Sequence, residues 1–280
     1  MKLYELNQQI STILSEAAIS EASLETFYIL EHVLKISRST YFLKKSEKVS
    51  KEAYERCICI AKERSRHKPL QYILGTQEFM GLCFYVNENV LIPRQDTEGL
   101  VEQVLAMAKE GEHILDLCTG SGCIGISLKK YMPSLQVTAV DISLEALAVA
   151  EKNAQSLQAD ITFLESDLFD KVTGTFDFIV SNPPYIESAK IPTLMPEVKD
   201  HEPRLALDGK EDGLYFYRKI IEESKNHLNL QGMLCLEIGC HQGSAVAGLM
   251  KEQGFVQVEV AQDLCGLDRN VYGRIGGNHV

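Results

Sequence analysis

Apolar residues in the first 75 positions recur every three or four residues, which is the spacing of one face of an α-helix. The pattern predicts three amphipathic helices, and we expect Ser23 and Ser50 to cap the second and third at their amino ends. Because their other faces are polar and carry no cluster of reactive side chains, residues 1–75 are expected to form a helical bundle that holds a partner or braces a larger domain. The predicted apolar faces comprise Leu6, Ile10, Ile13, Leu14 and Ala17; Leu24, Phe27, Leu30, Val33 and Leu34; and Ala53, Cys57, Ile60 and Ala61.

After Gly75 the apolar spacing changes. Short apolar runs near 79–86 and 90–92 predict a β-hairpin linker over residues 76–93. Over residues 94–280 apolar runs alternate with helical periodicity, which predicts an α/β domain with a mostly parallel, seven-stranded sheet covered on both faces. The strands are expected near 113–118, 135–140, 160–165, 175–181, 232–238, 255–260 and 271–276, and the helices near 97–109, 122–131, 143–156, 213–228 and 241–253.

One connection, residues 186–212, shows little periodicity and contains three prolines. Long connections without regular structure are uncommon inside compact domains and are often functional. We expect this segment to act as a lid.

Composition and charge narrow the classes of function. The chain is 45% hydrophobic with a formal charge of −11, and residues 1–75 carry +3 while residues 76–280 carry −14. An acidic main domain argues against tight binding to nucleic acid, which depends on neutralising phosphates. Eight cysteines without a CxxC pair predict reduced thiols, no metal site and a cytoplasmic protein, and no run is apolar enough for a signal peptide or a membrane span.

A glycine loop follows the first predicted strand of the sheet. Residues Thr119-Gly120-Ser121-Gly122 open the next helix, and Asp141 ends the second strand. Glycines let a ligand approach the backbone, and a helix start offers free N–H groups. Since Gly120-x-Gly122-x-x-Gly125 also satisfies the dinucleotide fingerprint and Asp141 would accept ribose hydroxyls, a nicotinamide dehydrogenase and a methyltransferase both fit this loop.

Further side chains at the strand ends favour the methyltransferase. Asp116 precedes the glycine loop, where a carboxylate suits the cationic amino-acid end of S-adenosylmethionine better than a pyrophosphate. Asp167 follows the third strand and is expected to accept the adenine amino group, with Leu168 and Phe169 flanking the ring. The fourth strand ends in a distinctive stretch.

That stretch is Ser181-Asn182-Pro183-Pro184-Tyr185. The Asn182 side chain offers both an acceptor and donors, prolines hold the preceding carbonyls at fixed angles, and Tyr185 could lie against a planar group. Such a constellation is suited to orienting an N–H2 nitrogen toward an electrophile. Asn-Pro and Pro-Pro are also ordinary turn dipeptides, so the stretch alone does not decide.

Together these motifs resemble the S-adenosylmethionine-dependent Rossmann-like methyltransferases that modify planar amino nitrogens. Segments such as Gln71-Tyr72-Ile73-Leu74-Gly75, Leu91-Ile92-Pro93-Arg94 and Glu202-Pro203-Arg204-Leu205 narrow the resemblance to the release factor glutamine methyltransferase family, over nearly the whole chain. The chain departs from the family at Gln95-Asp96, at Cys118 and at Leu168. The resemblance implies cofactor-binding residues Asp116, Cys118, Thr119, Gly120, Ser121, Gly122, Asp141, Asp167, Leu168 and Asn182.

The resemblance also implies an activity. A methyl group would pass from S-adenosylmethionine, leaving S-adenosylhomocysteine, to the glutamine amide of the Gly-Gly-Gln loop in peptide-chain release factors. Asn182 and Pro183 would orient that amide, with Pro184 and Tyr185 completing the substrate site, and residues 1–75 would recognise the release factor. We expect a monomer that binds neither DNA nor membranes. A DNA adenine methyltransferase, a nicotinamide oxidoreductase and an inactive binding module are the alternatives.

Overall fold

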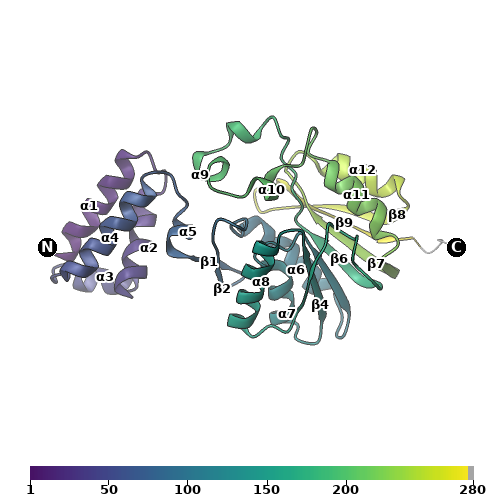
Figure 1. The fold of residues 1–280 in the computed structure, drawn as a ribbon, viewed down its shortest axis with the longest axis horizontal. Coiled ribbons are helices and arrows are strands. Elements are labelled where there is room, and N and C mark those ends of the chain that lie inside the picture. Colours follow the sequence, from purple (N-terminus) through teal and green to yellow (C-terminus); the bar gives the residue numbers. More distant parts are fainter. Residues whose placement is uncertain (277–280) are drawn as a thin grey trace. The chain divides into compact units, whose positions relative to one another are not determined.

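The computed structural model describes residues 1–276 of the 280 in the chain. The chain forms two compact units, drawn in Figure 1 and treated separately below. Unit 1 comprises residues 1–75 together with 195–201, and unit 2 comprises the other described residues.

Unit 1 is a helical bundle, with more helices than the three predicted. Ser50 caps its fourth helix as expected, since its hydroxyl accepts a 3.1 Å hydrogen bond from the backbone of Ala53. The prediction for Ser23 is wrong, because the second helix already begins at Ala22, and Leu24 is exposed rather than on the apolar face. A buried cluster that includes Leu6, Ile10 and Ile29 holds the bundle together. The helices are α1 (Leu3–Glu16), α2 (Ala22–Leu34), α3 (Arg38–Lys44), α4 (Lys51–Arg64) and α5 (Leu70–Leu74).

A second chain segment completes unit 1. The short helix α9 (Pro196–Lys199) brings Glu197 to Arg64, whose side chain is only 7% exposed. The Arg64 guanidinium pairs with Glu197 at 3.1 Å and with Glu25 at 2.7 Å, and His67 also contacts Glu197. Residues 195–201 therefore group with unit 1, although they fall within the range expected for the larger domain.

Unit 2 begins with the expected hairpin. Strands β1 (Thr76–Phe79) and β2 (Leu82–Tyr85) pair antiparallel, and the side chains of Phe79 and Phe84 are buried. The strand predicted at 90–92 is absent, since Val90 and Ile92 are buried in an irregular segment that leads into Pro93.

The sheet of unit 2 has seven strands in the order β5-β4-β3-β6-β7-β9-β8. The pairs along β5-β4-β3-β6-β7 are parallel, and β9 runs antiparallel to both β7 and β8. This confirms the mostly parallel α/β prediction. The strands are β3 (His113–Leu117), β4 (Gln136–Asp141), β5 (Thr162–Glu165), β6 (Phe176–Ser181), β7 (Leu228–Glu237), β8 (Phe255–Gln262) and β9 (Asp268–Ile275).

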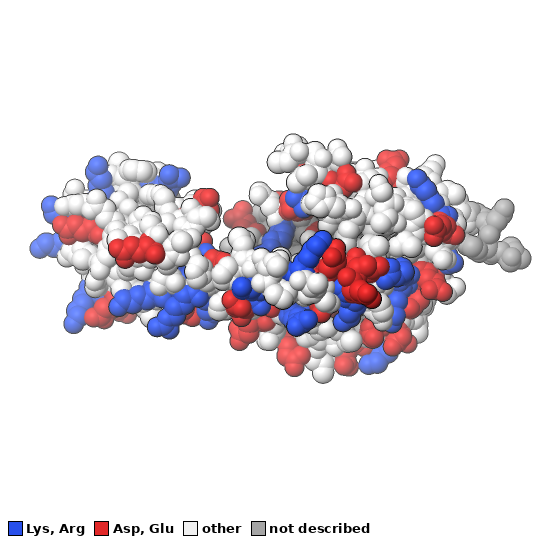
Figure 2. Space-filling view, turned by 90° about the horizontal axis from the view of Figure 1, so that it is seen from above, with Lys and Arg blue, Asp and Glu red and all other residues white. Residues whose placement is uncertain are grey.

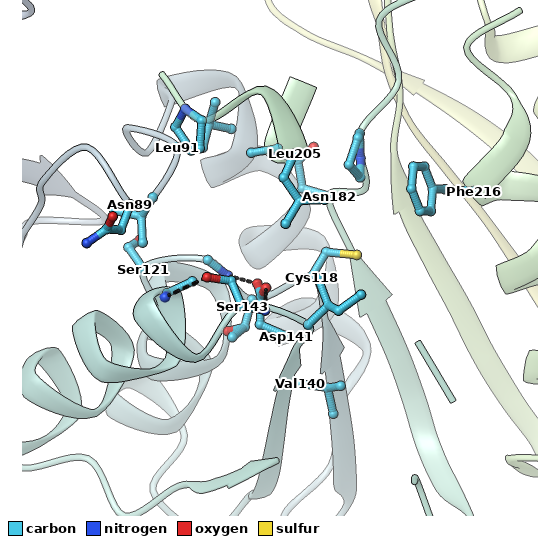
Figure 3. A pocket seen from close by; sticks show the side chains of 18 of the residues that line it. Asn89, Leu91, Cys118, Ser121, Val140, Asp141, Ser143, Asn182, Leu205 and Phe216 are labelled. Carbon is cyan, nitrogen blue, oxygen red and sulfur yellow. Dashed lines mark hydrogen bonds between the residues drawn. The ribbon is translucent and has the colours of Figure 1, made fainter. Parts of the chain in front are cut away.

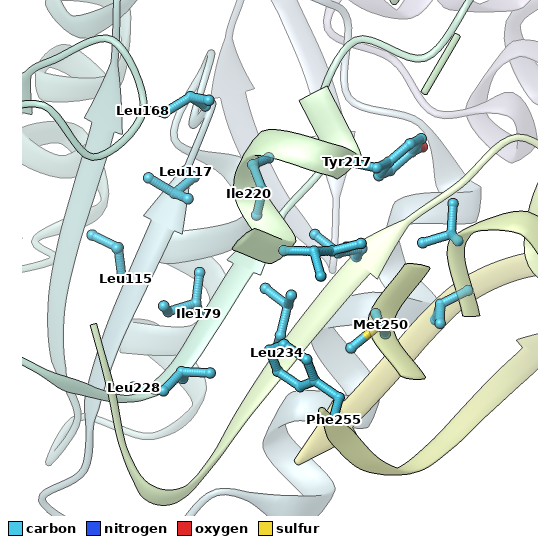
Figure 4. Close-up of a cluster of buried hydrophobic side chains, with 14 of the residues drawn as sticks. Leu115, Leu117, Leu168, Ile179, Tyr217, Ile220, Leu228, Leu234, Met250 and Phe255 are labelled. Carbon is cyan, nitrogen blue, oxygen red and sulfur yellow. The ribbon is translucent and has the colours of Figure 1, made fainter. Parts of the chain in front are cut away.

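Side chains on alternate strand positions enter two separate cores, as expected for a sheet buried on both faces. Leu115 and Ile179 pack in the core that Tyr217 and Met250 close (Figure 4). Ile114 and Phe178, their neighbours in sequence, pack in the opposite core together with the hairpin phenylalanines. The covering helices are α6 (Glu98–Met107), α7 (Cys123–Tyr131) and α8 (Leu144–Leu157) around the second core, and α11 (Tyr215–Ser224) and α12 (Gly243–Glu252) around the first.

The segment expected to lack regular structure, residues 186–212, contains short helices. They are η2 (Ile191–Thr193), α9 and α10 (Arg204–Leu207), and each has three or four residues, too few for a periodic pattern in the sequence. In η2 and α9 a proline lies in the first turn, where its missing N–H is not needed.

Charges of both signs are interspersed on the face of the molecule seen in Figure 2. Within residues 1–276, no helix is both long and apolar enough to cross a bilayer.

Candidate active site

The predicted site residues gather where the carboxyl ends of β3, β4 and β6 meet at one edge of the sheet. β3 and β6 are neighbours, but the chain continues from β3 to β4 on one side and from β6 to β7 on the other. Such a reversal leaves a crevice between the two loops, which is the usual ligand site of open α/β sheets. A cavity of about 540 Å³ lies here, lined by Cys118, Asp141 and Asn182 among others (Figure 3).

Asp116 lies beneath the glycine loop and is fully buried. Its Oδ2 accepts a 2.6 Å hydrogen bond from the hydroxyl of Thr119 and a 3.0 Å bond from the backbone N–H of Gly125. A Cβ atom at Gly125 would lie 3.0 Å from this oxygen, so the glycine permits the close approach. Burial raises the pKa of Asp116 to about 7, against the effect of both hydrogen bonds. Asp116 thus shapes the loop from below and is not among the cavity-lining residues.

The glycine loop itself forms one wall of the cavity through Cys118, Thr119, Gly120 and Ser121. Gly122, which precedes α7, has a φ of 80°, and a Cβ there would lie 2.7 Å from the Ile126 side chain. The loop therefore requires glycine at this position, but Gly122 supports the wall and does not line it.

Asp141 faces the cavity from the end of β4. Its Oδ2 accepts a 2.9 Å hydrogen bond from the backbone of Gly120, and its Oδ1 accepts a 3.0 Å bond from the backbone of Ser143. These bonds hold the carboxylate in one orientation, while burial raises its pKa. Each oxygen can still accept a further hydrogen bond from a ligand hydroxyl.

Asp167 and Leu168 also line the cavity, after β5. Leu168 is buried and adopts a left-handed backbone conformation with a φ of 47°, which turns the chain sharply behind the exposed Asp167. Phe169, which we expected beside the adenine ring, is instead buried in the core and stacks on His227 with the ring centroids 4.8 Å apart.

Asn182 and Pro184 form the wall after β6. The hydroxyl of Ser181 donates a 2.7 Å hydrogen bond to the Leu117 carbonyl, which ties the ends of β6 and β3 together. The Asn182 Nδ2 group donates a 3.3 Å bond to the Thr97 hydroxyl. Pro183 is buried and does not line the cavity.

Tyr185 packs against the core and does not line the cavity. Its backbone fits between glycines, since a Cβ atom at Gly213 would lie 2.4 Å from the Tyr185 carbonyl oxygen and one at Gly209 would lie 2.7 Å from its Cα. The Gln242 side chain donates a 3.1 Å hydrogen bond to the same carbonyl. Burial raises the pKa of the Tyr185 phenol.

The two ends of the predicted lid pair with each other within unit 2. Ile186 forms an isolated bridge to Asp208. The Ile186 N–H donates a 3.0 Å hydrogen bond to the Leu207 carbonyl, and the Gly209 N–H donates a 2.8 Å bond to the Ile186 carbonyl. Arg94 lines the cavity and pairs with the buried carboxylate of Glu202. This ion pair ties the segment to a residue of the cavity wall.

Several lining residues carry no recognisable signal in the sequence. Ile142 and Ser143 follow Asp141, and Phe216 and Lys219 come from α11. Their sequence context is that of ordinary helix and loop positions, so no local pattern distinguishes them. Thr97, directly before α6, also lines the cavity.

Comparison with protein families identifies both parts of the chain. Residues 5–75 match the family model described as PrmC N-terminal domain, and residues 95–198 match the methyltransferase small domain.

Solved structures with the same fold include a methyltransferase from Pyrococcus furiosus, with a TM-score of 0.54 and 18% identity over 71% of this chain and 91% of that one. Another is the 16S rRNA N2 G1207 methyltransferase of T. thermophilus in complex with AdoMet and guanosine, with a TM-score of 0.53 and 16% identity over 72% of this chain and 50% of that one.

The sequence relatives are much closer. A release factor glutamine methyltransferase from Geobacter sulfurreducens is 43% identical over 94% of this chain and 93% of its own length. One from Bacillus cereus is 39% identical over 98% of this chain and all of its own length. The chain therefore belongs to the release factor glutamine methyltransferase family.

Proposed function

We propose that this protein transfers a methyl group from S-adenosylmethionine to the side-chain amide nitrogen of the glutamine in the Gly-Gly-Gln motif of peptide-chain release factors. The observation that carries the proposal is the presence of Asn182, Asp141 and the glycine loop on the walls of one cavity. Family membership supports the choice of acceptor.

The residues around the cavity fit S-adenosylmethionine. Asp141 offers carboxylate oxygens to the ribose hydroxyls, and Asp167 offers an acceptor to the adenine amino group beside the apolar side chains of Ile142 and Leu168. The cavity volume of about 540 Å³ lies in the range of sites for ligands of this size. When bound, the cofactor supplies an electrophilic methyl carbon on a sulfonium.

Orientation is the chemical task of the chain's own residues. An amide nitrogen is a weak nucleophile because its lone pair is delocalised into the carbonyl. We assign the Asn182 side-chain oxygen and the Pro183 carbonyl as acceptors for the two amide hydrogens, which would leave the lone pair directed at the methyl carbon. Because Pro183 does not line the cavity, its carbonyl would have to turn toward the substrate on binding. Positioning of this kind can supply a large share of the barrier reduction. A nitrogen–carbon bond forms as the sulfur–carbon bond breaks, and the nitrogen then loses one proton to water without an assigned general base.

Tyr185 belongs to this machinery through its backbone. Because its ring packs against the core and its carbonyl is held by Gln242, we assign it the task of fixing the turn that carries Asn182 and Pro183. Contact of its ring with the substrate amide would require the side chain to move.

Unit 1 is the proposed recognition element for the release factor. The cavity is lined by unit 2 residues alone among those described, so unit 1 is free for a role outside the chemistry. The match of residues 5–75 to the PrmC N-terminal domain supports this assignment.

The test is a transfer assay with radiolabelled S-adenosylmethionine. We expect label on a release factor and none on its variant with the Gly-Gly-Gln glutamine changed to alanine. Equal labelling of both proteins would overturn the assigned acceptor. Transfer to duplex DNA alone would favour an adenine methyltransferase, which the net charge of −14 on residues 76–280 disfavours.

A further inference from the structure

Glu237 is a buried acid next to the proposed active site that the mechanism above does not use. It is the last residue of β7, and the preceding Leu236 pairs with Ser181, directly before Asn182. The residue is 3% exposed, and its Oε2 atom has no hydrogen-bond partner within residues 1–276. An unpartnered carboxyl oxygen in such a position is costly, which points to a role for this side chain.

Two polar side chains that line the cavity, Thr97 and Asn182, act on this carboxyl. Hydrogen bonding by the Thr97 hydroxyl and the Asn182 amide lowers the pKa of Glu237, against the larger effect of burial. These two also contact each other, because Asn182 Nδ2 lies 3.3 Å from the Thr97 hydroxyl oxygen. Asp96 and Arg269 are the charged groups that act on the same carboxyl, and the Tyr217 hydroxyl donates to the backbone carbonyl of Glu237.

The number of hydrogens available for hydrogen bonding determines how the side-chain amide of Asn182 is oriented. A carboxylate only accepts hydrogen bonds, so both neighbours must turn donors toward Glu237. Thr97 has a single hydroxyl hydrogen, and when that hydrogen points to Glu237 the Thr97 oxygen can only accept from Asn182. The Nδ2 end of Asn182 is then turned toward Thr97 and Glu237, which leaves its Oδ1 end for the cavity that Asn182 lines.

We propose that Glu237 and Thr97 are positioning residues that fix the side-chain amide of Asn182, with Nδ2 held inward and Oδ1 presented to the substrate amide. The proposal rests on the proposed function, because only an acceptor-type substrate contact gives the orientation a purpose. A flipped Asn182 would turn donors toward the N–H2 group of the substrate and repel it.

The protonation state of Glu237 affects this arrangement of Glu237, Thr97 and Asn182, called the relay below. Burial raises the pKa of its carboxyl to about 7, and the donors Thr97 and Asn182 oppose that rise. Once protonated, the carboxyl can itself donate a hydrogen bond, and either orientation of the Asn182 amide can then be accommodated.

The first test compares turnover in three variants. Glu237→Gln keeps the size of the side chain but can present either end of its amide, and Thr97→Val removes the hydroxyl at nearly constant volume. Each is expected to lower kcat about tenfold while the KM for S-adenosylmethionine changes less than about twofold. Thr97→Ser, the matched control, should restore most of the turnover that Thr97→Val loses. Unchanged kcat in both Glu237→Gln and Thr97→Val would overturn the proposal.

A double-mutant cycle separates this relay from a general structural role. In an Asn182→Ala background, Glu237→Gln should produce no further loss of kcat, because the group through which it acts is gone. A full additional tenfold loss there would mean that Glu237 acts by another route. Calorimetric measurement of cofactor binding checks that each variant folds. If Glu237→Gln does not fold, the kcat of Thr97→Val tests the proposal.

A measurement that needs no substrate tests the orientation of Asn182 independently of the assigned reaction. The side-chain amide hydrogens of Asn182, identified in ¹⁵N spectra by their loss in Asn182→Ala, should exchange with solvent at least about tenfold faster in Glu237→Gln than in the wild type. Equal exchange rates would overturn the relay. Failure of the wild type to label a release factor would overturn the proposed function and leave this exchange test decisive for the relay.

Discussion

The backbone N–H of Gly120 donates a 2.9 Å hydrogen bond to Oδ2 of Asp141 and thereby ties the glycine loop after β3 to the end of β4. Asp141 thus has two tasks, since it fixes one wall of the cavity and also presents a carboxylate to whatever ligand enters.

Replacement of Asp141 by alanine is expected to weaken the binding of S-adenosylhomocysteine about 10- to 100-fold, because hydrogen bonds to a charged group contribute ~1.5–3 kcal/mol each. Calorimetric titration measures the Kd. Asp170→Ala is the control, because this exposed acid lies in the loop after β5 but is not among the cavity-lining residues. An unchanged Kd for Asp141→Ala would contradict the proposal that Asp141 binds the ribose hydroxyls.

Asn182→Ala is expected to reduce kcat by about 100-fold, the scale of a lost positioning contact, with a much smaller effect on the Kd for the cofactor. Single-turnover transfer to a release factor gives the rate. Asn226→Ala, an exposed asparagine after α11, is the control and should behave as wild type. Full activity in Asn182→Ala would rule out the orientation mechanism.

Gly213→Ala is expected to lower both the melting temperature and kcat. The added Cβ would lie 2.4 Å from the Tyr185 carbonyl oxygen, and the residue has a φ of 71°. The matched control is Gly174→Ala, which has a φ of 84° but no atom within 4 Å of the added Cβ. Backbone strain of ~1–2 kcal/mol applies to both variants, so a lower stability of Gly213→Ala alone measures the collision. Equal melting temperatures would show that the turn can yield.

The pH dependence of stability is expected to change in Glu237→Gln. In the wild type, the pKa of the Glu237 carboxyl rises from an ordinary value of 4.5 to about 7 on folding. Between these pH values Glu237 is therefore ionised in the unfolded chain but keeps its proton in the folded chain. The carboxyl therefore stabilises the fold less as pH rises through this window. Glutamine has no such titration. The melting temperature of Glu237→Gln relative to wild type should thus increase from pH 4.5 to pH 8, and a difference independent of pH would contradict the raised pKa.

Arg64→Ala is expected to destabilise unit 1 by about 3 kcal/mol, because it strands the carboxylates of Glu25 and Glu197 in a mostly buried site. Urea unfolding followed by circular dichroism measures this. Lys51→Ala serves as the control, since its ion pair with Glu55 is exposed and should contribute less than ~1 kcal/mol. Equal losses of unfolding free energy in the two variants would contradict the structural role of Arg64.

The order of strands and helices in unit 2 was predictable because strand periodicity and turn residues are local properties of the sequence. The positions at strand ends followed from it, so the convergence of Asp141, Asp167 and Asn182 on one cavity could be anticipated from parallel topology alone. The missing strand at 90–92 shows the limit of this reasoning, since an apolar run also suits an irregular buried segment.

Contacts between residues distant in sequence were not predictable in the same way. The hydrogen bond from Asn182 to Thr97 joins residues 85 positions apart, and nothing local to either one indicates the other. The place of Asp116 beneath the loop, rather than in the cavity, likewise depends on hydrogen bonds to Thr119 and Gly125 that only the folded turn creates.

Unit 1 is built from two separate segments of the chain, which has a consequence for its folding during synthesis. Glu197 lies 133 residues after Arg64, so the ribosome releases α1 to α4 long before the second carboxylate for this guanidinium exists. The bundle can bury its apolar residues early, but its last ion pair can close only after most of the sheet domain has been translated. Completion of the amino-terminal unit is thus timed by the emergence of the segment that follows Asn182.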